Sequence, residues 1–327
     1  MAKPNSRNAL KAISGYDSLD AFAEFVLSLL ETEYGLAVKA LPALHIGFGL
    51  AVEAETPDAN YFLKCSSLEA HSHPDDLIAW WAELQVQNYP IPHLIRTKNW
   101  KWYLTPWEDA VVYLMTKLSG QPRKIHTQKT LDQFIEWLAA IHSWGEQYPH
   151  DNRGSLANWN EKWEQRQALL KALEPFDFLD QYLITRAMQE IEALGPQAFT
   201  EVIVHGDARL CHAFYEGEAF AGFIDFDQST QGERWIDLCY GLISGPEPHS
   251  GSQLTLEQVQ YGLKHYHEWL KIPANEQAAL KAHFAFAGLE TLAELAKFHQ
   301  RGVLPLEDIR KTESLLIAIL TAETLVE

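Results

Sequence analysis

The spacing of apolar residues divides the chain into a first part that favours strands and a second part that favours helices. Near the N-terminus, apolar residues recur at helical spacing and predict an amphipathic helix over 18–34. Short apolar runs bounded by turn-forming residues then predict strands within 36–64 and at 101–104 and 110–115. Between these runs, Pro74 suits the first position of a helix.

Beyond Thr116 the apolar positions mostly follow the period of helices. Amphipathic helices are predicted over 131–141, 159–173, 178–194 and 280–298. This order of elements predicts an α+β protein of two lobes, a small β-rich lobe at 1–116 and a larger, mostly helical lobe at 117–327.

One stretch, residues 202–242, interrupts the helical part with strands and clustered polar residues. Short strands are predicted at 202–204, 213–215 and 220–224. The first strand leads into the polar segment HGDARLCH, and the third leads directly into a second acidic segment. Because loops at strand ends hold reactive side chains on a rigid base, we expect Asp207, His212 and Asp225 to converge.

Two carboxylates and an imidazole in this arrangement suit phosphoryl transfer. The reaction needs a carboxylate that orients the attacking hydroxyl and accepts its proton, and it needs ligands for the metal that bridges the phosphates. Asp207 fits the first role, while His212 and Asp225 fit the second. Arg209, two residues beyond Asp207, is placed to stabilise charge on the transferring phosphoryl group.

The same stretch carries three motifs in a fixed order, namely HGDxxxxH at 205–212, IDFD at 224–227 and WIDL at 235–238. Together they resemble the aminoglycoside phosphotransferase family, relatives of choline kinase and homoserine kinase with a protein-kinase-like fold. The resemblance implies that Asp207 is the catalytic residue, that Asp225 binds metal and that Asp237 has a structural role. It further implies that ATP, or GTP, and Mg²⁺ are the cofactors.

Within these three motifs the match departs from the family at one position, and in the first lobe Asp76 stands where the family usually has a glutamate. Where the family usually has an asparagine at the end of its HGDxxxxN motif, this chain has His212. An imidazole is a poorer ligand for Mg²⁺ than an amide oxygen, because Mg²⁺ prefers hard oxygen donors. The histidine is nevertheless similar to that of aminoglycoside 2″-kinases and macrolide kinases of the family, so we interpret it as a subfamily trait.

Nucleotide-binding residues are predicted in the first lobe. Gly47 and Gly49 lie between possible strands, where they either let the backbone approach a phosphate or form a plain hairpin turn. By resemblance, Lys64 reaches the α- and β-phosphates; the alternative is a lysine that only protects an edge strand. By resemblance, Asp76 or the adjacent Asp75 pairs with Lys64, although acids in a first helical turn also complement the helix dipole.

The segment LMTKLSG at 114–120 resembles the family's hinge between lobes. The resemblance implies that the adenine base forms hydrogen bonds with backbone groups near Met115 and Lys117. Both residues are therefore predicted to contact the nucleotide.

Composition narrows the class of partner. The 327-residue chain has a formal net charge of −18, which argues against a nucleic-acid-binding surface. Its cysteines, Cys65, Cys211 and Cys239, form no CxxC pair and are odd in number, so we expect reduced thiols. The N-terminal segment has no apolar signal core, and no run is long enough for a membrane span. A cytoplasmic protein that binds no membrane is expected.

The predicted function is transfer of the γ-phosphate of a nucleotide to a hydroxyl group of a small molecule. An aminoglycoside, a macrolide, an amino alcohol, homoserine or a sugar all fit as the acceptor. Two other functions stay open: a weak or inactive kinase-like nucleotide-binding protein, because His212 and Asp76 depart from the family's residues, and a metal hydrolase that uses Asp207, His212 and Asp225.

Overall fold

The computed structural model describes residues 10–11, 13–46, 49–67, 74–107, 110–123, 126–147, 158–243 and 253–326. The chain divides into two compact units, Met1–Leu118 and Ser119–Glu327. Each unit is described separately below.

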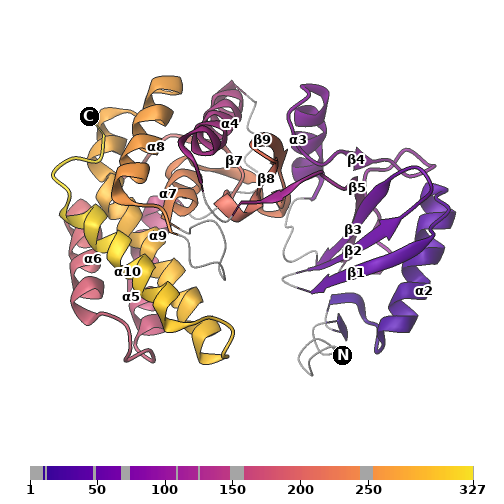
Figure 1. Cartoon of the computed structure of the whole chain (residues 1–327), viewed down its shortest axis with the longest axis horizontal. Helices are drawn as coiled ribbons and strands as arrows, with labels where there is room; N and C mark the ends of the chain where they lie inside the picture. Colours follow the sequence, from indigo (N-terminus) through magenta and orange to yellow (C-terminus); the bar gives the residue numbers. More distant parts are fainter. Residues whose placement is uncertain are drawn as a thin grey trace. The chain divides into compact units, whose positions relative to one another are not determined.

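The first unit is built on an antiparallel sheet with the strand order β1-β2-β3-β5-β4 (Figure 1). Its strands are β1 (Ala40–Ile46), β2 (Leu50–Glu55), β3 (Asn60–Ser67), β4 (Leu94–Ile95) and β5 (Ala110–Thr116). The sheet is accompanied by helix α2 (Leu19–Leu29), which is continued by a π-helical turn at Leu30–Tyr34, and by helix α3 (Pro74–Val86). The predicted N-terminal helix and the helix start at Pro74 are thereby confirmed.

Alternation of side chains along the strands gives the sheet two different faces. On one face, Leu63 and Leu114 pack with α2 residues such as Val26 in a buried apolar cluster. On the other face, the Tyr113 ring lies 5.7 Å from the ring of Trp81 on α3. Helix α2 therefore covers one face of the sheet, while α3 contacts the other.

Strand β1 forms one edge of the sheet and is irregular. It contains Pro42, and its register with β2 shifts between Ala40 and Ala43. The opposite edge is the two-residue strand β4. The strand predicted at 101–104 is wrong, because this segment makes only a single bridge, between Leu104 and Val112.

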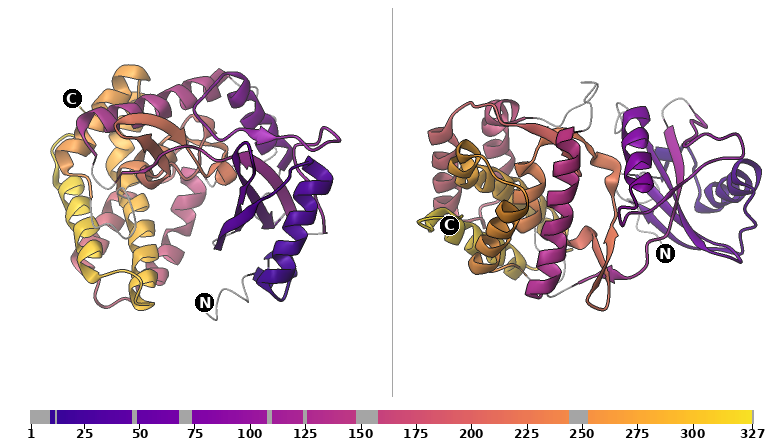
Figure 2. Two further views of the ribbon diagram at one scale, coloured as in Figure 1. Left: turned by 45° about the vertical axis from the view of Figure 1, so that its right-hand side comes forward. Right: turned by 90° about the horizontal axis from the view of Figure 1, so that it is seen from above.

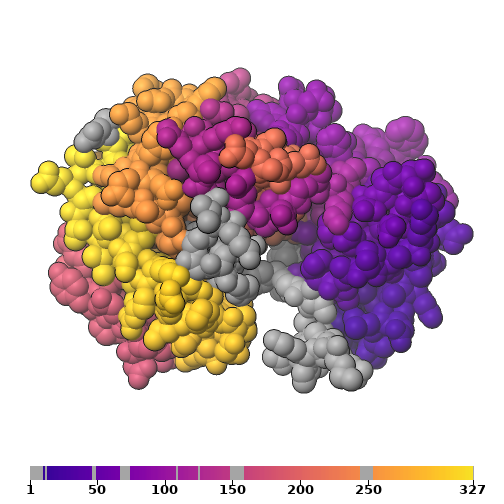
Figure 3. Space-filling view, viewed as in Figure 1, coloured from indigo at the N-terminus to yellow at the C-terminus, as the bar shows by residue number. Residues whose placement is uncertain are grey.

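The second unit is mostly helical. Its helices are α4 (Gln128–Gln147), α5 (Trp159–Leu173), α6 (Gln181–Leu194), α7 (Trp235–Ile243), α8 (Leu256–Trp269), α9 (Ala274–Gln300) and α10 (Leu306–Thr321). Helix α9 is largely buried and packs against α6, α7 and α10. The side chains of the C-terminal helices form the broad orange-to-yellow surface in Figure 3.

Two small sheets lie against α4 in this unit. Helix α4 is the magenta helix in the two views of Figure 2. Strand β7 (Glu201–Val204) pairs with β10 (Thr230–Glu233), and β8 (Ala213–Glu216) lies between β6 (Gln121–Pro122) and β9 (Ala219–Phe223). The strands predicted at 213–215 and 220–224 are thus confirmed as β8 and β9, which pair with each other. A β-rich first unit and a mostly helical second unit agree with the predicted α+β class. None of the helices within the described ranges is long and apolar enough to cross a membrane.

Candidate active site

A carboxylate on α7 holds the loop that follows β7. The buried Asp237 accepts hydrogen bonds from the backbone N–H groups of His205, at 2.6 Å, and Gly206, at 2.8 Å. Gly206 has a φ of +81°, and a Cβ atom there would collide with the carbonyl oxygen of Gln228. Only glycine fits this position without strain, which explains the middle residue of the HGD motif.

Two further buried side chains, His142 and Tyr266, fix the position of Asp237. His142 of α4 donates from Nε2 to Asp237 Oδ2 at 3.0 Å, and its Nδ1 lies 2.7 Å from the Tyr266 hydroxyl. All three side chains are fully buried. The structural role predicted for Asp237 agrees with these contacts, because buried polar groups need partners.

His205 supports the loop through both ring nitrogens. Nε2 lies 2.9 Å from the Ile224 carbonyl oxygen, to which it donates, and Nδ1 accepts from the Asp207 backbone N–H at 3.2 Å. Burial lowers the pKa of His205 and favours the neutral ring. A neutral ring with its proton on Nε2 matches both hydrogen bonds. His205 therefore connects the loop after β7 to the end of β9.

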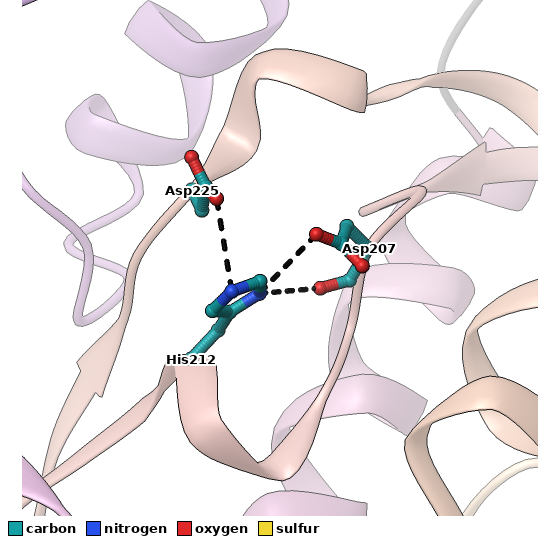
Figure 4. Close-up of side chains that lie close together, drawn as sticks. All are labelled: Asp207, His212 and Asp225. Atoms are coloured by element: carbon teal, nitrogen blue, oxygen red, sulfur yellow. Dashed lines mark hydrogen bonds and ion pairs between the residues drawn. The ribbon is translucent and has the colours of Figure 1, made fainter. Parts of the chain in front are cut away.

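Asp207, His212 and Asp225 converge as expected (Figure 4). One ligand atom from each lies within 4.8 Å of the others. The His212 ring stands between the two carboxylates, with Nδ1 3.6 Å from Asp207 Oδ2 and Nε2 3.7 Å from Asp225 Oδ2. His212 Nδ1 also lies 2.8 Å from the Asp207 carbonyl oxygen. Two carboxylates and an imidazole at this separation form a donor set that fits a divalent cation.

The backbone at Asp225 is unusual. Asp225 has a φ of +71°, in the left-handed region that few residues other than glycine adopt, and it begins the 3₁₀ turn Phe226–Gln228. Aspartate tolerates this region better than most residues. The turn allows the chain to leave β9 with the Asp225 carboxylate facing His212.

Neighbouring groups set the charge of His212. Burial favours the neutral imidazole, but the Cys211 sulfur and the carboxylates of Asp207 and Asp225 outweigh burial and raise the pKa of His212. A metal ion that uses the imidazole as a ligand therefore competes with a proton for the ring.

Arg209 links Asp207 to the long helix α9. Its Nε donates to Asp207 Oδ1 at 2.7 Å, and its Nη2 donates to Glu294 Oε2 at 3.1 Å. Burial disfavours the charged guanidinium, but the carboxylates of Asp207 and Glu294 raise the pKa of Arg209 above its ordinary value. Arg209 therefore carries its charge between two acids.

The predicted nucleotide-binding residues lie in the first unit. Lys64 is half-buried in β3, opposite Tyr113, so it lies on the sheet face that contacts α3. Because β3 lies between β2 and β5, the edge-strand interpretation of Lys64 is wrong. Gly49 precedes β2, and a Cβ atom there would meet the Cys65 carbonyl oxygen at 2.9 Å. Gly47 lies outside the described residues.

The acid expected to pair with Lys64 sits in the first turn of α3. Asp76 is half-buried there, whereas the exposed Asp75 accepts a hydrogen bond from the Tyr103 hydroxyl at 2.6 Å. Asp75 is thus held by Tyr103. The pairing of Lys64 with Asp76 stays a prediction.

Met115 and Lys117 lie at the end of β5. Met115 is buried between β3 and β4. The Lys117 ammonium group pairs with Glu53 at 2.5 Å, and its backbone N–H donates to the Asn60 carbonyl oxygen at 3.0 Å. The N–H of Thr116 likewise donates to the His93 carbonyl oxygen. These two donors are therefore already used within the unit, and a base would need other backbone groups of the segment.

Sequence reasoning missed Tyr266, and it considered Glu294 only as an acid that could meet a cationic acceptor. Tyr266 completes the hydrogen bonds of His142, and Glu294 holds Arg209. Both lie on helices distant in the chain from the motif, and neither belongs to a recognisable local pattern. Only the packing of α8 and α9 brings them to the loop.

Comparison with known proteins gives one family. Residues 50–272, more than half of the chain, match the phosphotransferase enzyme family. The matched segment includes Lys64, Asp207, His212 and Asp225. No curated protein matches the chain.

Solved structures of small-molecule kinases resemble the chain over nearly its whole length. A spectinomycin phosphotransferase in complex with ADP and spectinomycin has a TM-score of 0.59 at 16% identity, covering 92% of this chain and 95% of that one. An amicoumacin kinase in complex with AMP-PNP and Ca²⁺ has a TM-score of 0.61 at 15% identity, and the match covers 94% of this chain and 97% of that one. A microcompartment-associated aminopropanol kinase has a TM-score of 0.61 at 15% identity, and the match covers 91% of this chain and 95% of that one. At these identities the likeness shows the fold, and it confirms the predicted kinase-like class.

Proposed function

Because the chain belongs to the phosphotransferase enzyme family, we propose that it transfers the γ-phosphoryl group of ATP, or of GTP, to a hydroxyl group of a small molecule. The family membership confirms the resemblance inferred from the motifs. The observation that supports the reaction best is the convergence of Asp207, His212 and Asp225 within 4.8 Å.

In this proposal Asp207 orients the attacking hydroxyl and accepts its proton. His212 and Asp225 hold the divalent cation, Mg²⁺, which when bound neutralises charge on the phosphates. Lys64 contacts the phosphates, with Asp76 as its partner, and Gly47 and Gly49 cover them. The base lies against the segment of Met115 and Lys117. Residues 1–116 then form the nucleotide-binding lobe and 117–327 the catalytic and acceptor-binding lobe; the unit boundary at Leu118 supports this division.

The acceptor belongs to a wide class. An aminoglycoside, a macrolide, an amino alcohol, homoserine or a sugar offers the required hydroxyl. The solved structures named for spectinomycin, amicoumacin and aminopropanol support a small-molecule acceptor. The net charge of −18 argues against nucleic acid as a partner. Cys65, Cys211 and Cys239 are free thiols, which supports a cytoplasmic location.

One observation favours a second function, a kinase-like protein that binds nucleotide without efficient turnover. The Cys211 sulfur and the carboxylates of Asp207 and Asp225 raise the pKa of His212, and only the neutral imidazole is a metal ligand. Metal binding at this cluster therefore competes with a proton. A variant with asparagine at position 212 removes that competition and separates the two functions.

Thermal unfolding with Mg²⁺–ATP and Mg²⁺–GTP tests the proposal. A ligand that binds only the folded state raises the melting temperature, and at 100 times its Kd it stabilises by about 2.7 kcal/mol. We expect one or both nucleotides to raise the Tm of the wild type and to lose most of this effect in Asp225→Ala. Asp227→Ala, which removes an acid from the same turn but outside the cluster, should keep it.

A Tm that neither nucleotide changes over a wide concentration range would contradict nucleotide binding. Nucleotide binding without phosphate transfer to a broad panel of hydroxyl compounds would favour the second function. Phosphate release from simple esters with metal and without nucleotide would instead indicate the hydrolase.

A further inference from the structure

We propose that Arg209 is a positioning residue, and that Glu294 of α9 acts through it to fix the orientation of the Asp207 carboxylate. This inference rests on the proposed function, in which Asp207 orients the acceptor hydroxyl. It assigns a role to a residue of α9 that lies 85 positions from Arg209 in the chain.

The contacts divide the two oxygens of Asp207 between different neighbours. Oδ1 accepts from Arg209 Nε at 2.7 Å, while Oδ2 lies 3.6 Å from His212 Nδ1. The hydrogen bond from Arg209 fixes Oδ1, and this leaves Oδ2 as the oxygen on the side of His212. Arg209 therefore determines which oxygen of Asp207 faces the cluster with His212 and Asp225.

The orientation of Arg209 is itself fixed from two directions. Its Nη2 donates to Glu294 Oε2 at 3.1 Å, and the guanidinium is planar, so the bonds at Nε and Nη2 define one plane. Its backbone N–H donates to the Asp207 carbonyl oxygen at 2.8 Å, and its carbonyl accepts from His212 at 2.9 Å. A tight loop thus holds the base of the side chain, and α9 holds its end.

The exposed fractions agree with a link that is structured yet accessible. The side chains of Asp207 and Arg209 are each 26% exposed, and that of Glu294 is 36% exposed. Pairs at this exposure add little to stability because solvent screens them. Their larger effect is on geometry, since a misplacement of about 1 Å at a reacting group can cost about 100-fold in rate.

Helix α9 provides a matched control one turn away. Glu290 lies four residues before Glu294 and also pairs with a cation, Lys162 Nζ, at 3.0 Å. It also accepts a hydrogen bond from the Tyr240 hydroxyl. Neither of these partners contacts Asp207 in the described structure. Glu290→Gln and Glu294→Gln therefore make the same chemical change on the same helix, but only the second affects Asp207.

The experiment measures ADP formation from Mg²⁺–ATP, with water as the acceptor, for wild type, Glu294→Gln and Glu290→Gln. We expect Glu294→Gln to lower kcat about 10-fold with an unchanged KM for ATP. Glu290→Gln should leave both constants unchanged. If Arg209 instead contacted the nucleotide phosphates directly, Arg209→Gln would chiefly raise the KM for ATP, and that result would overturn the inference.

A second measurement does not depend on turnover. The melting temperatures of Arg209→Gln, Glu294→Gln and the double variant form a cycle. If the pair exists in solution, the double variant melts no lower than the less stable single variant. Equal kcat values for the two glutamate variants would overturn the inference.

Failure of the proposed function is visible in the wild type alone, as absence of ATP binding and of ADP formation. The inference fails with it in that case, even if the cycle detects the pair. Failure of the inference alone leaves the wild type active and affects only the comparison of the variants.

Discussion

At the scale of single residues, the site depends on backbone conformations that few side chains permit. Gly206 has a φ of +81°, and Asp225 has a φ of +71°. The first allows the backbone N–H groups of the loop to reach Asp237, and the second allows Asp225 to face His212. Strain of this kind persists where the surrounding contacts determine the conformation.

A pair of glycine substitutions separates strain from collision. Gly206 and Gly217 both have positive φ, but only Gly206 would place a Cβ atom against neighbouring backbone, that of Gln228. We expect Gly217→Ala to lower the unfolding free energy by about 1 kcal/mol and Gly206→Ala by about 3 kcal/mol or more. Urea unfolding of both variants measures the difference, and equal losses would show that the loop rearranges to admit the methyl group.

Residue identities predicted much of this site, because its parts are close together in the chain. Asp207, His212 and Asp225 lie within one hairpin and its flanking loops, so a local pattern places them together. Glu294 could not be found in this way, since its contact with Arg209 depends on how α9 packs. The role of Asp76 also stays open, because a pairing between a strand and a helix is not determined by spacing.

At the scale of elements, Asp237 joins three helices to the catalytic loop. Its carboxylate on α7 accepts from the loop backbone and from His142 on α4, and His142 contacts Tyr266 on α8. The loop therefore takes its shape from the helical core. The sequence pattern predicted α4 as a helix over 131–141, but it predicted no helix over the range of α8. The strand expected at 101–104 was wrong because Trp102 and its neighbours favour strands without finding a partner strand.

Substitution of Asp237 tests this link. In Asp237→Asn, one carboxylate oxygen becomes an NH₂ group, which donates hydrogen bonds and cannot accept them. The backbone N–H group of either His205 or Gly206 therefore loses its acceptor oxygen. We expect a loss of about 3 kcal/mol of unfolding free energy, together with loss of phosphate transfer. Tyr266→Phe, which removes the hydroxyl at the outer end of the network and leaves Asp237 unchanged, should cost about 1 kcal/mol. Denaturant titration compares the two, and similar costs would contradict a central role for Asp237.

At the scale of the whole molecule, buried histidines connect stability to pH. His283 of α9 is fully buried, its ring stacks on Trp235 at 4.5 Å, and within the described structure neither ring nitrogen has a hydrogen-bond partner. Burial lowers the pKa of His283 to about 3 and that of His126 to about 4. In the unfolded chain both would titrate near 6.5. Their contribution to stability is thus present above pH 6.5 and is lost as the pH falls towards 4.

Replacement of His283 by phenylalanine should remove its part of this loss. The unfolded wild type binds a proton at position 283 below pH 6.5 that the folded protein rejects, which costs about 1.4 kcal/mol per pH unit. We therefore compare the unfolding free energies of His283→Phe and wild type at pH 7 and at pH 5. Between pH 7 and pH 5, their difference should shift by about 2 kcal/mol in favour of the variant. Other titrating groups cancel in this comparison.

The control is the exposed His93, whose replacement by phenylalanine removes no buried imidazole. The change that His283→Phe shows between pH 7 and pH 5 should exceed the change that His93→Phe shows. A pH-independent difference for His283→Phe would show that the buried ring binds a proton in the folded protein as readily as in the unfolded chain.

The irregular outer strand β1 bears on how separate copies of the chain meet one another. An open sheet edge offers unpaired backbone groups along which a strand of a second molecule can align. Pro42 lacks an N–H to donate, and the register shift between Ala40 and Ala43 interrupts the even spacing of the remaining groups. The opposite edge, Leu94–Ile95, is too short to template such an addition. Neither edge of this sheet therefore favours the addition of a strand from a second molecule, and the features responsible take no part in phosphate transfer.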